Sequence, residues 1–443
     1  MEFSYINEPL PKIDNGLFLL VLLVTLAATF ALCEFPVYFA GIIVAIIFLA
    51  SVYNLPELGV GAFVNGLYLV GYLWRGFGIT YLITPLAVVL CAIGLTHYVW
   101  NRGLAWRFGI LPGMVLLIGG LLFVGILYSP LSSEGFEKAG RYLSMNLFIF
   151  FATMLFIGDL NKIKNLLKII AVIGFVLAII SVIYIGFAGI ENISRFTLPG
   201  QNPIWFARGL GISLLATLFW IKLTQKKFQK LVFMIFICLM LFLTYITASR
   251  GPFFALLVVL ILYFLLLQGG KLNSLRTLSF ILLIIFSLKF FIAFAPGQIF
   301  HRMLNLFARF DITTFYRLRA FETAKDLFFD NPLMGVGTGG FGHFNILAYP
   351  HNVFLELASE LGILGVMALI VMILYAGYLG IKLLRNKNAS TLESNLSKTF
   401  FAIFIFSLIN SQISGEISGN YELWFSVAGI WTLYSTRERF LER

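Results

Sequence analysis

The sequence predicts an all-α integral membrane protein, a polytopic bundle of about 12 to 14 transmembrane helices. The first observation is composition: 60% of the 443 residues are hydrophobic, 12% are charged, and mean hydropathy is +0.95. A soluble protein has about 45–50% apolar and about 25% charged residues. The second is continuity: runs such as 253–267 and 279–294 lack the apolar–polar alternation of barrel strands. A soluble enzyme and a β-barrel are therefore excluded.

The predicted spans follow from the length that a helix needs, roughly 20 apolar residues for about 30 Å of hydrocarbon. The short second and third runs fit either two spans or one broken pair, which sets the range of the count. A membrane bundle (1–295), a long loop (296–360) and C-terminal spans (361–443) result. The runs lie at 17–33, 35–53, 58–74, 79–99, 109–128, 142–158, 166–189, 203–221, 231–248, 252–268, 275–295, 361–383, 399–414 and 421–435.

Charge predicts the orientation of the bundle. One set of alternate loops, together with the two ends of the chain, holds 19 of the 31 basic residues. The positive-inside rule places this set and both termini in the cytoplasm. Although the net charge is +11, no basic stretch is soluble enough to form a nucleic-acid-binding domain.

The other basic residues are expected at or near the outer face, where short loops should carry few positive charges. For any single residue the alternative is headgroup contact or snorkelling. As a group they predict an outward-facing anion site. They are Arg75, Lys138, Arg141, Arg195, Arg208, Arg250, Lys289, Arg302, Arg309, Arg317, Arg319 and Lys325.

The loop over 296–360 is far longer than the usual helix-bundle connection of about 2–8 residues. Within it, 313–330 is predicted to form an amphipathic helix that Asp311 or Thr313 caps and that Asn331-Pro332 ends. We therefore expect a helical exterior domain. The predicted apolar stripe of the helix consists of Leu318, Phe321, Ala324 and Phe328.

The motif Tyr349-Pro350-His351-Asn352 opens a second helical pattern over 353–361. Because proline is favoured in a first helical turn, His351 is expected near a helix amino terminus. The helix dipole there disfavours an imidazolium and keeps the ring neutral, as a general base requires. Free backbone N–H groups at the same end attract anions such as a diphosphate. A purely structural histidine is the alternative.

A second motif, Thr247–Pro252, interrupts two apolar runs. Its Gly-Pro pair breaks the helix and leaves Arg250 at membrane depth, where a cation is costly and marks a functional candidate. A guanidinium binds phosphate oxygens bidentately and keeps its charge in a partly dry site. We predict that Arg250 binds phosphate; snorkelling from a helix end is the alternative.

No motif indicates a cofactor or a metal. The run Gly335–Gly340 matches the dinucleotide pattern G-x-G-x-x-G, but the strand and βαβ unit that the pattern needs are missing. We interpret it as a turn that lets backbone segments pack closely. The sequence contains no H-E-x-x-H motif, no phosphate-binding P-loop and no Cys–His cluster.

The stretches 349–356 and 360–362 resemble the hallmark of the O-antigen ligase and O-antigen polymerase superfamily. The resemblance covers roughly 195–435, and the first half of the chain matches only as a region rich in spans. Further matching segments are 200–203, 249–251, 319–320, 330–333, 335–337, 414–415 and 420–424.

The resemblance implies a metal-independent glycosyltransferase of the bacterial inner membrane, acting on its periplasmic face. Such an enzyme moves a glycan from undecaprenyl diphosphate to an acceptor hydroxyl. It also implies His351 as the base, with Arg250 and either Arg319 or Arg317 binding the diphosphate. Accessory candidates are Asn352, Glu356, Arg141, Arg195 and Arg208.

Inversion at the anomeric carbon is expected unless an enzyme carboxylate acts as nucleophile. Glu356, Glu360 and Glu416 lie near the same predicted face, so that alternative stays open, as does one of them as the base.

Several activities fit this family. A polymerase of O-antigen or another surface polysaccharide is favoured, from the resemblance at 414–424. Ligation onto lipid A core or onto protein is the alternative. Expected partners are the lipid-linked donor, a glycan or lipid acceptor, membrane lipids and a chain-length regulator protein. A flippase for lipid-linked glycans would predict repeated halves and charges across the bilayer centre, and no internal repeat is found.

Overall fold

The computed structural model describes residues 55–66, 109–189, 194–199, 201–265, 289, 297–299 and 312–441. The chain divides into two compact units, Met1–Asn54 and Leu55–Arg443, and the first lies outside the described residues. The predicted spans at 17–33, 35–53 and 79–99, and all of 275–295 except residue 289, lie outside them as well. The count of 12 to 14 spans therefore stays a prediction.

Within these ranges every regular element is helical and no strand occurs, which confirms the all-α class. Five of the described helices, α9, α10, α11, α17 and α18, are long and apolar enough to cross a membrane. The elements are α3 (Pro56–Gly61), η1 (Ala62–Gly66), α6 (Ile110–Ile126), α7 (Ser132–Arg141), η2 (Tyr142–Leu147), α8 (Phe148–Phe156), α9 (Leu160–Ala188), α10 (Pro203–Leu223), α11 (Lys227–Ile246), α12 (Arg250–Leu265), α15 (Ile312–Asp330), α16 (Phe341–Phe344), α17 (Val353–Leu384), α18 (Thr391–Ser411), η3 (Ser418–Asn420) and α19 (Tyr421–Leu441).

Capping side chains, rather than hydropathy, determine where several helices begin. Asp159 accepts a hydrogen bond from the backbone N–H of Lys162 at 2.9 Å, so α9 begins at Leu160 rather than at the predicted residue 166. Ser390 accepts from the backbone of Glu393 at 3.1 Å, and α18 begins eight residues before the predicted position 399. These polar first turns lie ahead of the apolar runs, so both helices begin several residues before the predicted spans.

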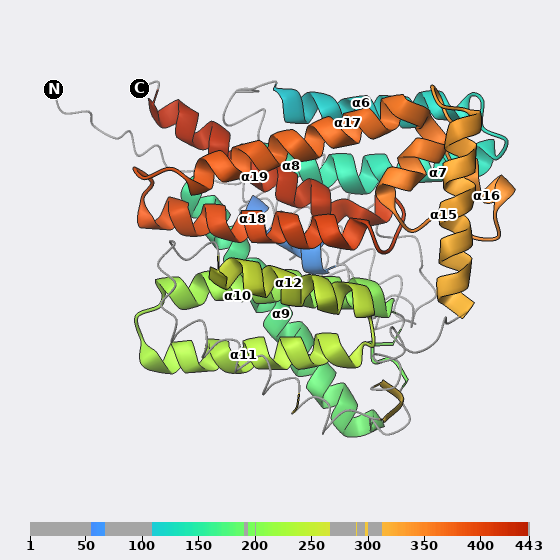
Figure 1. The fold of residues 1–443 in the computed structure, drawn as a ribbon. Coiled ribbons are helices and arrows are strands. Elements are labelled where there is room, and N and C mark those ends of the chain that lie inside the picture. The colour runs from blue at the N-terminus through green and yellow to red at the C-terminus, as the bar shows by residue number, and fades with distance from the viewer. Residues whose placement is uncertain are drawn as a thin grey trace, which may run out of the picture. The chain divides into compact units, whose positions relative to one another are not determined.

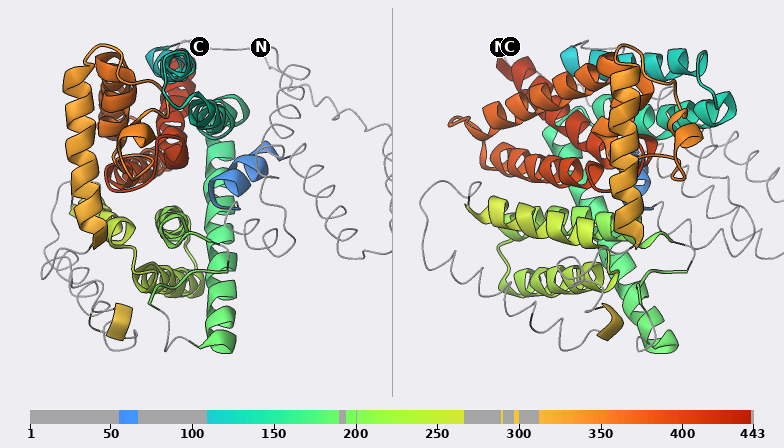
Figure 2. Two further views of the ribbon diagram at one scale, coloured as in Figure 1. Left: turned by 90° about the vertical axis from the view of Figure 1, so that its right-hand side faces the viewer. Right: turned by 45° about the vertical axis from the view of Figure 1, so that its right-hand side comes forward.

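Most of the long helices run across Figure 1, whereas α15 stands crosswise to them (Figure 1). In the turned view of Figure 2, α10, α17 and α18 are seen nearly end-on and α15 along its length. We call the end of the helices beside α15 the α15 end. The α11–α12 and α18–α19 connections and the start of α17 lie there (Figure 1).

The other end of the helices, which we call the opposite end, holds the α10–α11 and α17–α18 connections (Figure 1). Several of the predicted cytoplasmic cations flank these connections, for example Lys222, Lys226 and Arg385. Arg141, Arg250 and Arg317 belong to elements at the α15 end (Figure 1). These members of the two charge groups thus lie at different ends of the described helices, and which end faces the cytoplasm stays a prediction.

Helix α15 packs through a different stripe from the predicted one. Its buried side chains are Ala320, Ala324 and Leu327, which cluster with Phe341 of α16. Leu318, predicted to face the core, is 45% exposed, so that part of the stripe was wrong. Small alanines allow α15 to approach the 336–355 segment closely, and the buried face is rotated accordingly. The helix ends at Asp330, as Asn331-Pro332 predicted; Asp311 and the side chain of Thr313 lie outside the described residues.

A break at Gly362 divides α17 into a short segment over 353–361 and a long apolar segment. Gly362 has φ +64°, and a Cβ there would lie 2.5 Å from the carbonyl carbon of Leu333. The backbone N–H of Ile363 instead donates to the carbonyl of Pro332 at 2.8 Å. The break lies beside the predicted boundary at 360/361. The break therefore separates the direction of the short segment, which follows His351, from that of the long segment.

Candidate functional site

Backbone strain coincides with the two motifs that the sequence singled out. In the described part of the chain, the non-glycine residues with positive φ are His351 (59°) and Ala248 (49°). A strained residue of this kind costs about 1–3 kcal/mol and tends to occur at active sites and ligand clamps. One lies in Tyr349–Asn352 and the other in Thr247–Pro252, so both motifs are functional candidates on structural grounds as well.

His351 lies one residue before the N-cap of α17, which confirms its predicted place near a helix amino terminus. The N-cap is Asn352, whose Oδ1 accepts from the backbone of Phe354 at 3.0 Å and of Leu355 at 3.1 Å. The ring of His351 packs edge-on against Tyr349, with centroids 4.6 Å apart. Its Nδ1 is buried and has no hydrogen-bond partner among the described residues.

Burial, and secondly the positive charge of Arg317, lower the pKa of His351 to about 4. Both effects disfavour the imidazolium. The ring is therefore neutral at neutral pH, as expected, and a buried ring nitrogen remains for a proton or a hydrogen bond.

The two arginines of α15 differ in their surroundings. Nη1 of Arg317 donates to the carbonyl oxygen of Ile413 at 3.2 Å, and this is the arginine whose charge reaches His351. Arg319 is exposed. Residues two apart on a helix point to different sides because each step turns by about 100°. The structure thus brings Arg317, rather than Arg319, to the histidine.

The connection that follows α18 gathers the motifs; we call residues 412–417 the 412–417 turn. Nδ2 of Asn352 donates to the carbonyl of Gln412 at 3.2 Å, next to the Arg317 contact at Ile413. A Cβ at Gly251 would lie 2.9 Å from Cγ2 of Ile413, so the start of α12, where Arg250 lies, packs directly against the same turn. Three segments far apart in sequence therefore contact Gln412 or Ile413: the His351 motif, α15 and the start of α12.

Arg208 is a buried tie to the same turn. Its Nη2 donates to the carbonyls of Ser414 at 2.7 Å and Asn410 at 3.1 Å, and Nη1 lies 3.7 Å from the carboxylate of Glu422. Only 1% of the residue is exposed. Arg208 holds α10 to the 412–417 turn and presents almost no surface to a substrate.

The remaining accessory arginines also contact connections at the α15 end. Arg195 donates to the carbonyl of Thr247 at 3.4 Å and to Oγ of Ser249 at 3.3 Å, beside Arg250 in sequence. Arg141 pairs with Glu137 and, at 3.0 Å, with Glu416 of the 412–417 turn. They shape the surroundings of the candidate site.

A buried ion network joins α7 to the short segment of α17 that follows His351. Nζ of Lys138 is 2.7 Å from Oε1 of Glu356 and 2.7 Å from Oε1 of Glu360. The second oxygen of Glu356 accepts from the backbone of Ile417 at 2.9 Å, and that of Glu360 from Gly339 at 3.0 Å. Both carboxylates are thus engaged, which favours His351 over them as the base. Sequence reasoning missed Lys138 as their partner, although the i,i+4 spacing places both carboxylates on one helix face.

The glycine run is a packing turn, as interpreted from the sequence. The backbone N–H groups of Val336 and Gly337 donate to the carbonyls of Ser359 at 2.8 Å and Glu360 at 2.9 Å. Gly337 has φ +89°, and a Cβ there would lie 2.6 Å from the Cα of Ser129. The run therefore lets two backbone segments touch beside the ion network.

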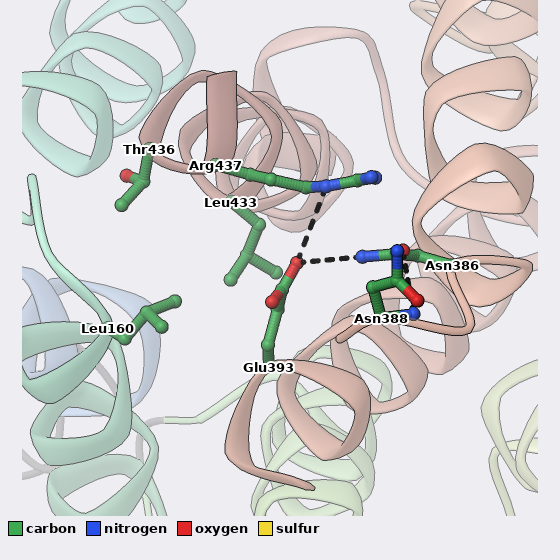
Figure 3. A pocket seen from close by; sticks show the side chains of 7 residues that line it. All are labelled: Leu160, Asn386, Asn388, Glu393, Leu433, Thr436 and Arg437. Atoms are coloured by element: carbon green, nitrogen blue, oxygen red, sulfur yellow. Dashed lines mark hydrogen bonds and ion pairs between the residues drawn. The ribbon is translucent and has the colours of Figure 1, made fainter. Parts of the chain in front are cut away.

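The cavity drawn in Figure 3 lies at the opposite end, between the start of α9, the α17–α18 connection and α19. Its volume is about 240 Å³, and Glu393 and Arg437 point toward one another in it, 3.9 Å apart (Figure 3). None of the predicted site residues lines it. Among the described residues, no group of three or more His, Cys, Asp or Glu side chains is placed to hold a metal ion.

The comparison with protein families gives one match that covers both the arginines and the histidine. Residues 233–370 match the model of a family described as O-Antigen ligase. This range contains Arg250, Arg317, Arg319 and His351 and ends just after the break at Gly362. The comparison with curated proteins found no match. The segment 233–370, in a chain of several apolar membrane-length helices, is therefore similar to the O-antigen ligase family, as the motifs around His351 indicated.

Proposed function

We propose that this chain is a glycosyltransferase that moves a glycan from undecaprenyl diphosphate to an acceptor hydroxyl at the periplasmic face of the bacterial inner membrane. The supporting observation is the neutral His351 beside Arg317 inside the segment that matches the O-antigen ligase family; the buried Nδ1 of His351 has no partner among the described residues. Extension of O-antigen or another surface polysaccharide is the favoured reaction. A chain-length regulator is then a candidate protein partner.

In the proposed reaction His351 accepts the proton of the acceptor hydroxyl through a ring nitrogen. The acceptor oxygen forms a bond to the anomeric carbon, and the bond from that carbon to the diphosphate oxygen breaks. The electron pair stays with the leaving undecaprenyl diphosphate. A direct displacement of this kind inverts the anomeric configuration. General-base assistance typically contributes about 10²–10⁴ in rate.

The low pKa of His351 links the base to the donor. A group with a pKa of about 4 accepts protons weakly at neutral pH. A diphosphate bound at Arg317 would compensate the positive charge that, after burial, contributes to this low pKa. The pKa of His351 then rises, although burial, the larger cause, still holds it below its ordinary value. The base therefore becomes effective when the donor is in place.

Arg317 and Arg250 are the proposed diphosphate ligands. Arg317 is fixed by its bond to Ile413, and the start of α12 packs on the same residue. Guanidinium groups bind phosphate oxygens bidentately and remain charged in partly buried sites. Their attraction grows as negative charge develops on the leaving diphosphate, which lowers the barrier.

Ligation of a finished glycan is a second candidate, because the matching family is described as O-Antigen ligase. The two reactions differ in the acceptor alone. Purified protein in lipid nanodiscs is given a lipid-linked repeat unit, either alone or with lipid A core. A ladder of longer glycans from the donor alone supports the polymerase. Product only when core lipid is present supports the ligase. Transport without any new glycosidic bond contradicts both.

The mechanism also requires that the α15 end face the periplasm. Reporter fusions after residues 226 and 390, in the connections at the opposite end, should be cytoplasmic, and a fusion after residue 345 should be exterior. A cytoplasmic reporter at 345 would place His351 on the wrong side of the membrane and contradict the proposal.

A further inference from the structure

The proposed chemistry leaves one group of buried charges unused. Lys138, Glu356 and Glu360 are 3%, 0% and 1% exposed, and they pair as described above. Burial alone would lower the pKa of Lys138, but the carboxylates of Glu356, Glu360 and Glu416 outweigh it and raise this pKa above its ordinary value. The lysine therefore stays charged. Well-packed apolar side chains would often be as stable in such a place, so stability by itself explains the network poorly.

The network connects the segments that surround His351. Lys138 comes from α7, whereas Glu356 and Glu360 come from the short segment of α17 that follows His351. Through their second oxygens the carboxylates also hold Ile417 of the 412–417 turn and Gly339 of the glycine run. A single lysine thus fixes the short segment of α17 relative to α7.

We propose that Lys138 is a positioning residue, which anchors the 353–361 segment to α7 and so keeps His351 buried beside Arg317. Its effect on transfer rests on the proposed function, whereas its effect on the place of His351 does not. The two consequences can therefore be measured separately.

The environment of His351 can be read from its titration. Arg317 of α15 is the charged group that acts on it, and its ring neighbour Tyr349 is itself subject to the charges of Glu416, Glu356, Lys138 and Arg141. Diethyl pyrocarbonate reacts with neutral but not with protonated imidazole, and peptide mass spectrometry assigns the modified residue. With a pKa of about 4, His351 should react almost equally fast at pH 5.0 and pH 7.5. With an ordinary pKa of about 6.5 it would react about 30-fold more slowly at pH 5.0.

The test compares three variants in lipid nanodiscs. Lys138→Met removes the cation, and Lys138→Met/Glu356→Gln/Glu360→Gln replaces the ammonium and both carboxyl groups by uncharged groups but keeps side-chain oxygens for Ile417 and Gly339. Lys325→Met, on the exposed side of α15, is the matched control. Thermal unfolding, reactivity of His351 and glycan transfer are measured for each variant. Exposed His343 of α16 is the internal reference for the reagent.

In Lys138→Met we expect the reactivity of His351 at pH 5.0, relative to that at pH 7.5, to fall toward the 30-fold limit. Glycan transfer should fall with it. The reactivity of His343 in this variant, and both measurements in Lys325→Met, should match the wild type. The triple variant should recover thermal stability, because no buried charge is left unpaired, yet keep the altered reactivity of His351. If Lys138→Met does not fold, the reactivity of His351 in the triple variant tests the proposal instead.

Unchanged reactivity of His351 in a folded triple variant overturns the proposal, since the network would then serve stability alone. If reactivity shifts as expected but wild-type protein transfers no glycan, the positioning role stands and the proposed function fails.

Discussion

The two ends of the described helices hold their basic side chains in different ways. At the α15 end, Arg317 and Arg208 donate to backbone carbonyls of Ile413 and Ser414 in one turn. At the opposite end, basic side chains lie over aromatic rings: Lys164 over Trp220 at 5.8 Å, Lys222 over Tyr263 at 4.5 Å and Lys382 over Tyr434 at 4.8 Å.

We interpret this difference for Arg317 and the three lysines, because Arg208 is a buried tie that presents almost no surface to a substrate. A lysine over a ring near a helix end buries its stem and keeps its charge near water, which suits a membrane interface and the positive-inside rule. An arginine fixed to the carbonyls of a turn is held in one place, as recognition of an anion requires. The surroundings of a basic residue, rather than the number of basic residues, therefore support Arg317 as a candidate ligand of the proposed anionic donor.

The largest effect is expected from His351→Ala, which should lower glycan transfer by about 10²–10⁴ while donor binding persists. The physical reason is the loss of the only proposed proton acceptor. His351→Gln should fare no better, because an amide forms hydrogen bonds but does not accept the proton. Donor binding and turnover are measured on the same purified protein. Loss of binding together with turnover would make His351 a ligand or a structural residue, and the base would then be sought among Glu356, Glu360 and Glu416.

The next largest effect is expected from replacing the arginines that are proposed to bind the diphosphate. Arg317→Ala should lower transfer by about 10²–10³, as for the loss of one charge-stabilising contact in the transition state. Arg250→Ala should act similarly, and Arg250→Lys should restore transfer only in part, because an ammonium lacks the bidentate fork.

Arg319→Ala is the matched control for Arg317→Ala, since it removes the same charge from the exposed side of the same helix. Turnover near that of the wild type is expected for it. If Arg319→Ala is the more damaging of the two, the family resemblance locates the diphosphate better than the geometry does.

The fold class could be predicted from composition because a bilayer allows few spanning architectures. The starts of α9 and α18 could not, because Asp159 and Ser390 begin these helices in polar sequence ahead of the apolar runs. The break at Gly362 depends on the close approach of Leu333, a tertiary contact that hydropathy does not contain.

Only part of the candidate site could be predicted from the sequence, for a similar reason. The pattern Pro350-His351-Asn352 correctly placed His351 near a helix start, although Pro350 lies before the N-cap Asn352 and not in the first helical turn as the prediction assumed. The choice between Arg317 and Arg319 depended on which face of α15 is buried, and the predicted stripe was offset at Leu318. The pairing of Lys138 with Glu356 joins residues more than two hundred positions apart, so no local pattern could indicate it.

A smaller effect concerns pH. Because the folded protein holds the pKa of His351 near 4, the free enzyme should keep a neutral base down to about pH 5. The acid limb of kcat/KM, which reports the free enzyme, should therefore lie near pH 4. The acid limb of kcat should lie at higher pH, because bound diphosphate compensates Arg317. Equal acid limbs for the two parameters would contradict the proposed link between donor and base.

The smallest effect is expected at the opposite end, and it tests the comparison from the other side. Arg437 pairs with Glu393 at 3.9 Å on the cavity of Figure 3, and both side chains are partly exposed. Pairs of this kind contribute about 0–1 kcal/mol and are screened by salt. Arg437→Ala should therefore leave turnover near the wild type and lower the unfolding temperature little or not at all. A loss of about 10² in turnover with normal unfolding would equal the effect of a diphosphate-binding arginine. The cavity would then take part in the reaction, and the division between the two ends would be wrong.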